Sequence, residues 1–158
     1  MQGLSTQNYA AGISIITFVL VVTISMAYYQ FIYIPQVNEK PIVAAEVLHP
    51  PQTTQINIVP GSSQPSQTKN FEPKQISADL GMANKIIWKN TDSVPHSVTS
   101  DTDYADPIFG KFNSISHIGL VPPGQIFNFT FTQSGEYPYH CEPHPWMTGK
   151  LSIEKGKF

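Results

Sequence analysis

The chain has 158 residues, a formal net charge of −2 at pH 7 and 41% hydrophobic residues, which suits one globular domain of ordinary size. Its nine basic residues are all lysines and are scattered, so the chain lacks the basic stripe that a nucleic-acid backbone requires, and nucleic acid is not an expected partner. The single cysteine excludes an internal disulfide and any site built from several thiolates.

The N-terminal region has no Asp, Glu, Lys or Arg before Glu39, and residues 10–34 form an apolar stretch interrupted only by Ser, Thr and one Gln. A helix needs about 20 such residues to cross roughly 30 Å of hydrocarbon. We therefore predict a transmembrane anchor over residues 1–34. The alternative is a signal peptide cleaved after Ala27, but it would lack the usual positive charge and its apolar segment would be unusually long.

The composition then changes to Pro, Gln, Ser and Thr, which is typical of extended, solvated chain. We predict a tether over residues 35–52 and a folded domain over residues 53–158. Inside the domain, the polar run "PGSSQPSQT" also reads as solvated chain. Ile56 and Ile58 alternate with polar residues, as expected for a first edge strand.

The domain shows the alternation of β-strands, and its fold class is predicted to be all-β. Phe127, Phe129 and Phe131 share one face of a strand, and Tyr137, Tyr139 and Cys141 share one face of the next. The expected strands lie within 84–90, 96–100, 125–135, 136–141 and 150–155. Short strands separated by turn signals indicate a β-sandwich.

The stretch "YHCEPHPWM" (residues 139–147) carries the candidate chemistry. Cys141, His144 and Met147 supply a thiolate, an imidazole and a thioether on one short loop that two prolines stiffen. Soft sulfur ligands with imidazole suit copper, and a Cys-His-His set with a weak axial Met is the blue-copper arrangement. His96, which follows the turn "NTDSVP" and begins a strand, is the best candidate for the second histidine.

"NTDSVPHSVTS" followed by "EYPYHCEPHPWMTGKLSI" resembles the cupredoxins, and the C-x2-H-x2-M loop is most similar to their amicyanin and plastocyanin branch. The resemblance covers roughly residues 53–154. It implies a Greek-key β-sandwich with one copper ion held by His96, Cys141, His144 and Met147. It also implies transfer of single electrons between redox protein partners by an exported or membrane-bound protein.

Together with the apolar segment, this predicts a single-pass protein of the cell membrane, with its copper domain on the extracytoplasmic side and membrane-bound partners. An electron carrier is the favoured function. The alternatives are a copper oxidoreductase whose open site acts on a small molecule such as nitric oxide, and a copper delivery protein. A cysteine hydrolase using Cys141 and His144 lacks an orienting group, and zinc does not explain Met147.

The remaining polar and aromatic residues have ordinary interpretations. Among the other histidines, His140 is expected to be solvated, and the other two are expected to have no role in the site. Trp88 is expected in the core, and Trp146 either packs on the site or lies exposed beside it. The carboxylates between residues 101 and 106 read as a solvated acidic loop. Asn128 begins a formal N-glycosylation sequon on a face that glycosylation could reach. The other histidines and the loop carboxylates are His49, His117, His140, Asp101, Asp103 and Asp106.

Overall fold

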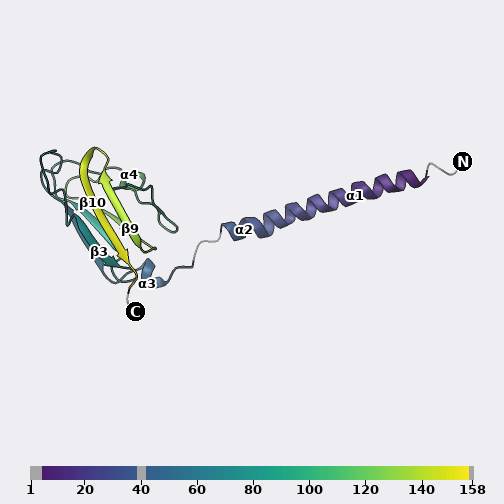
Figure 1. Cartoon of the computed structure of the whole chain (residues 1–158), viewed down its shortest axis with the longest axis horizontal. Coiled ribbons are helices and arrows are strands. Elements are labelled where there is room, and N and C mark those ends of the chain that lie inside the picture. The colour runs from purple at the N-terminus through teal and green to yellow at the C-terminus, as the bar shows by residue number, and fades with distance from the viewer. Residues whose placement is uncertain (1–4, 39–41, 157–158) are drawn as a thin grey trace. The chain divides into compact units, whose positions relative to one another are not determined.

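The computed structural model describes residues 5–38 and 42–156. The chain divides near residue 40 into a helical N-terminal unit and a β-rich C-terminal unit (Figure 1).

The N-terminal unit is one continuous run of helix made of α1 (Ser5–Tyr28), the π-helical turn η1 (Tyr29–Tyr33) and α2 (Ile34–Val37). Residues 12–37 are long and apolar enough to cross a membrane. Thr17 and Thr23 donate their hydroxyls to the carbonyls of Ile13 and Val19, both at 2.8 Å, so these polar groups are satisfied inside the apolar stretch. The helix is therefore compatible with the predicted anchor, whose insertion into a membrane stays a prediction.

The C-terminal unit is a sandwich of two four-stranded sheets with a small extra hairpin. One sheet has the order β2-β1-β4-β8 and the other the order β3-β10-β9-β5, while β6 pairs with β7. Two pairs are parallel, β1 with β4 and β10 with β3, and the others are antiparallel. The elements are α3 (Ala45–Leu48), β1 (Thr53–Ile58), β2 (Phe71–Glu72), β3 (Gln75–Asp79), β4 (Lys85–Asn90), β5 (Thr99–Ser100), β6 (Ala105–Asp106), β7 (Gly110–Lys111), α4 (Ser114–His117), β8 (Ile126–Thr130), β9 (Gly135–Cys141) and β10 (His144–Glu154).

The core lies between the sheets and is rich in aromatic side chains. The predicted inward faces are confirmed: Phe127, Phe129 and Phe131 are buried, as are Tyr139 and Cys141 on β9. Trp88 of β4 meets Tyr139 of the opposite sheet edge-on, with ring centroids 5.6 Å apart. The predicted all-β sandwich is therefore confirmed.

Two strand predictions need correction. The segment containing Ile56 and Ile58 is not an edge strand, because β1 pairs with β2 on one side and β4 on the other. The strand predicted over 96–100 shortens to Thr99–Ser100, because His96 instead forms an isolated antiparallel bridge with Val121. That bridge moves His96 out of the sheet and into a loop region.

The acidic loop is also not wholly solvated. Asp106 is only 3% exposed, and its carboxylate accepts hydrogen bonds from Tyr104, Ile108, Phe109 and Thr132. A buried carboxylate requires such partners, and they tie the β6–β7 loop to the chain after β8.

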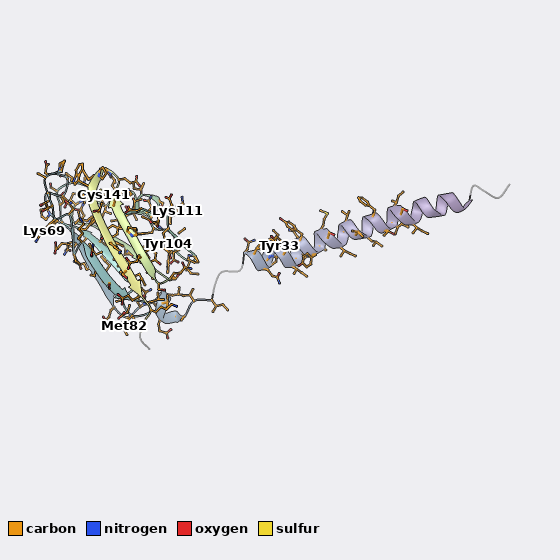
Figure 2. The ribbon with its side chains drawn as sticks, in the orientation of Figure 1. Tyr33, Lys69, Met82, Tyr104, Lys111 and Cys141 are labelled. Carbon is orange, nitrogen blue, oxygen red and sulfur yellow. The ribbon has the colours of Figure 1, made fainter. Side chains whose placement is uncertain are left out.

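Residues 42–52 contact the sandwich at the end away from the candidate site. The Asn84 side-chain amide donates to Val47 O at 2.8 Å, and Gln52 N donates to Met82 O at 3.0 Å. Figure 2 shows Met82 and Cys141 at opposite ends of the β unit. The tether over 35–52 stays a prediction: residues 39–41 lie outside the described residues, residues 35–37 belong to α2, and Val47 and Gln52 contact the β unit.

Gly149 provides a test of the core packing. A Cβ atom there would lie 2.3 Å from Cζ of the fully buried Tyr139, a distance that the ring cannot relieve without moving. We expect Gly149→Ala to lower the free energy of unfolding by about 3 kcal/mol in a denaturant titration, as for severe overpacking. At Gly135 the nearest atom would be 3.4 Å away, so Gly135→Ala is the control and should cost under about 1 kcal/mol. Equal losses for the two variants would contradict the close contact between Gly149 and Tyr139.

Candidate metal centre

Two separate connections meet at one end of the sandwich. The turn between β9 and β10 carries Cys141 and His144, and Met147 follows in the irregular stretch before regular pairing resumes at Thr148. The connection from β4 to β5 carries His96, whose bridge with Val121 is made by two hydrogen bonds of 3.2 and 2.7 Å. The ligands predicted from distant parts of the sequence therefore come from neighbouring backbone.

Three potential ligand atoms converge closely. His96 Nδ1 and His144 Nδ1 are 3.1 Å apart, and Cys141 Sγ lies 3.7 Å from the first and 3.5 Å from the second. His96 and Cys141 are fully buried, while His144 is partly exposed. One thiolate and two imidazole nitrogens at this spacing can bind a single metal ion in common.

Met147 is fully buried and belongs to the core cluster. It follows His144 by three residues within the β10 irregularity, which leaves its thioether on the metal loop and out of solvent. Burial suits both a weak sulfur ligand and a core side chain, so its role as the fourth ligand stays a prediction.

A buried carboxylate orients His96. Asp92 Oδ2 lies 2.8 Å from His96 Nε2, so the ring donates from Nε2 and presents the lone pair of Nδ1 to the site. Burial lowers the pKa of His96, although the hydrogen bond to Asp92 acts in the opposite direction. The neutral imidazole that results is the form that binds a metal.

Asp92 remains ionised because of its hydrogen bonds. Burial alone would raise its pKa, but donors that include the backbone of Gly61, the ring of His96 and the backbone of Ser93 lower it to about 2. The site thus contains a permanent negative charge beside one of its histidines.

Ser97 links the two connections. Its backbone N–H donates to Cys141 Sγ at 3.3 Å, and its hydroxyl accepts from Glu142 N at 2.8 Å. Burial raises the pKa of the Cys141 thiol, while the Ser97 hydrogen bond opposes that change. The N–H donor is therefore placed to stabilise a thiolate.

The aromatic side chain beside the site is both packed and exposed. Trp146 is 36% exposed, its ring centroid lies 5.4 Å from that of His144, and its indole N–H donates to Ser62 O at 3.0 Å. The sequence left open whether Trp146 packs on the site or lies exposed beside it. In the structure it does both, because it covers one side of His144 and remains partly exposed.

The other histidines lie outside this cluster. His140 pairs with Asp101 at 2.5 Å, and His117 is bonded to Lys111 O at 2.8 Å. His140 is therefore more restrained than the solvated side chain expected from the sequence. His49 and Asn128 are exposed, and glycosylation of Asn128 stays a prediction.

Three supporting residues were missed at the level of sequence. Asn90 and Asp92 fall in the "NTD" stretch, which reads only as a turn signal, and Ser97 follows the candidate ligand His96 but has no distinctive chemistry of its own. The fully buried Asn90 amide donates to Val94 O and Val121 O at 2.8 and 2.9 Å, which fixes the loop before His96. A polar run that ends a strand just before a candidate ligand was the available signal.

The chemistry of the donors fits copper. A thiolate and two imidazoles, with a thioether on the same loop, combine soft and intermediate ligands, whereas zinc sites use Cys, His and carboxylates without Met. Of the two carboxylates near the cluster, Asp92 is bonded to His96 and to backbone N–H groups, and Glu142 accepts hydrogen bonds from Thr99 and Asn113, so both are engaged by protein donors.

Comparison with known proteins agrees with this chemistry. The family model of copper-binding proteins of the plastocyanin/azurin family matches residues 62–154, more than half of the chain. The chain is 29% identical over 85 residues to amicyanin from Paracoccus denitrificans, covering 53% of this chain and 58% of that protein. It is 37% identical over 86 residues to a chloroplastic plastocyanin from Hordeum vulgare, covering 52% and 54%. Each match thus spans little more than half of the relative's length.

Solved structures support the same fold. A purple cupredoxin from Nitrosopumilus maritimus has a TM-score of 0.50 and 24% identity, covering 64% of this chain and 99% of that one. A copper-containing nitrite reductase from Thermus scotoductus has a TM-score of 0.50 and 18% identity, covering 73% and 27%. The β unit therefore has the cupredoxin fold, and the chain belongs to the plastocyanin/azurin family of copper-binding proteins.

Proposed function

We propose that this protein carries single electrons at one type 1 copper ion. The proposed ligands are His96, Cys141 and His144, with Met147 as the weak fourth ligand. The observation that carries the proposal is the convergence of the Nδ1, Sγ and Nδ1 atoms of the first three within 3.7 Å. Copper in such a site alternates between Cu(I) and Cu(II) and so holds or releases one electron.

The protein's part is to keep these ligands in place while the electron moves. Cys141 and His144 are register partners across a two-residue turn, and His96 is fixed by its bridge to Val121 and by Asp92. Ligands held from both sides cannot rearrange much, which favours rapid electron transfer.

Burial favours an electron carrier over an enzyme that binds a substrate at the metal. His96, Cys141 and Met147 are fully buried, so a small molecule has no exposed ligand position on their side. The likeness to a nitrite reductase concerns the fold alone. Electrons would instead enter and leave through the partly exposed edge of His144.

The surface near that edge is suited to brief protein contacts. Pro143, Pro145 and Trp146 are exposed beside His144, and Pro122 and Pro123 are exposed next to Val121, which pairs with His96. This mostly apolar surface, which has the exposed carboxylate of Glu142 in the same turn, permits docking with a redox protein and rapid release.

The apolar N-terminal helix supports a location at the membrane. In this proposal residues 10–34 anchor the chain, the copper domain lies on the extracytoplasmic side, and electron donor and acceptor are membrane-associated. Confinement to one surface would raise the effective concentration of such partners.

Spectroscopy of the full chain in detergent, oxidised with one equivalent of Cu(II), tests the proposed site. We expect an intense thiolate-to-copper absorption band and narrow copper hyperfine splitting in electron paramagnetic resonance, because Cys141 Sγ is the ligand that produces both. Cys141→Ser should lose the band, and Asp101→Asn, outside the cluster, should keep it. A colourless wild-type protein with ordinary hyperfine splitting would mean that Cys141 is not a copper ligand.

The turn residue Pro143 allows a prediction about the reduction potential. Proline has no N–H, and Pro143→Ala adds a backbone donor in the turn directly after Cys141, which we expect to reach its Sγ. A hydrogen bond withdraws electron density from the thiolate and stabilises the reduced site, so the potential should rise, by about 60 mV for each 1.4 kcal/mol gained. Voltammetry of the two proteins gives the difference. Pro145→Ala, beyond His144, is the control, and a lower or unchanged potential for Pro143→Ala would refute the explanation.

A further inference from the structure

The loop between β1 and β2 folds back on itself at the metal end of the sandwich. Val59 N donates to Asn70 O at 3.0 Å and closes the loop, while the hydroxyl of Ser62 donates to Val59 O at 2.6 Å. Ser62 is fully buried, although the sequence "PGSSQPSQT" reads as solvated chain. The first turn of this loop, Gly61-Ser62-Ser63, is therefore fixed to the fold, with Ser62 buried and Gly61 and Ser63 partly exposed.

The backbone of this turn binds the carboxylate that orients His96. The N–H of Gly61 donates to Asp92 Oδ1 at 2.9 Å, and the N–H of Ser63 lies 3.4 Å from Oδ2. The same Oδ2 is 2.8 Å from His96 Nε2. Gly61 has φ +82°, a left-handed conformation that a residue with a side chain adopts only with strain.

A carbonyl of the same turn binds the residue that covers His144. Ser62 O accepts the indole N–H of Trp146 at 3.0 Å, and the Trp146 ring lies against the His144 ring at 5.4 Å. Three consecutive loop residues thus connect, through one intermediate side chain each way, to both histidines of the site.

We propose that Gly61-Ser62-Ser63 is a brace that positions His96 through Asp92 and His144 through Trp146. The inference rests on the proposed copper site and adds the element that fixes its two imidazoles relative to each other. The brace consists only of protein groups, so it holds both rings before copper binds and while copper changes oxidation state. Without it, the rings could turn and the copper would be held more weakly.

Two substitutions loosen the brace without touching a proposed ligand. Gly61→Ala strains the left-handed turn but meets no atom closer than 3.7 Å. Trp146→Phe keeps an aromatic ring beside His144, removes the indole N–H donor and makes the aromatic group smaller. Gly110→Ala is the matched control, because Gly110 has φ +78°, lies in the β6–β7 hairpin, and offers open space within 4 Å of the Cβ atom that alanine would add.

The test uses the full chain in detergent and measures the copper hyperfine splitting and the rate of copper loss to a strong Cu(I) chelator. We expect Gly61→Ala and Trp146→Phe each to change the splitting and to accelerate copper loss on the order of tenfold, the usual effect of removing a group that orients a ligand. Gly110→Ala should match wild type in both. In the double variant, the rate of copper loss should rise by less than the product of the two single increases, because both substitutions act through one tripeptide.

The copper-free protein gives an independent measurement. In the braced protein the Trp146 indole N–H, identified by its absence from Trp146→Phe, exchanges with solvent on the order of tenfold more slowly than an exposed indole. Rapid exchange, or a Gly61→Ala variant that behaves like Gly110→Ala, overturns the brace. If the brace is overturned but the wild type still gives a normal type 1 spectrum, the proposed function stands. If the wild type gives no type 1 spectrum, the proposed function and the brace are both overturned.

Discussion

The contact between Trp88 and Tyr139 fixes where the metal centre can form. These fully buried rings come from opposite sheets, and each stands two residues before its strand ends, at Asn90 and at Cys141. The chain therefore leaves β4 and β9 at the same end of the sandwich, and the loop to His96 begins beside the turn after Cys141. Aromatic contacts of this type contribute roughly 0.5–1.5 kcal/mol beyond their buried area, so this contact also stabilises the packing of one sheet on the other.

Much of this arrangement could be predicted because it is encoded locally. Alternation along a strand identifies the buried face from two or three residues, as Phe127, Phe129 and Phe131 illustrate. The spacing of Cys141, His144 and Met147 likewise places three potential ligands on one turn, whatever the rest of the chain does. Local pattern alone could not assign His96, because His96 and Cys141 come within 3.7 Å of each other only through the packing of the two sheets.

The supporting groups could not be predicted for the same reason. Asp92 and Asp106 look alike in the sequence as polar loop residues, yet both are buried, one beside His96 and one against Thr132. Whether a carboxylate is solvated depends on which backbone N–H groups the fold brings to it, and these come from up to 31 residues away along the chain. Local composition contains no information about such partners, and the buried Ser62 was misread in the same way.

The two histidines of the proposed copper site have different surroundings, and the difference suits different tasks. His96 is buried beside the ionised Asp92, which adds a negative charge to that of the Cys141 thiolate. A buried site with two negative groups favours the more positive oxidation state, whereas the Ser97 N–H on Cys141 Sγ favours the reduced one, so the two effects oppose each other in setting the potential. His144 has no such role in the interior. Of the four proposed ligands, it alone has a partly exposed edge that a partner could contact. In the proposed site, the groups that set the potential would therefore lie in the interior, and electrons would be exchanged at the surface.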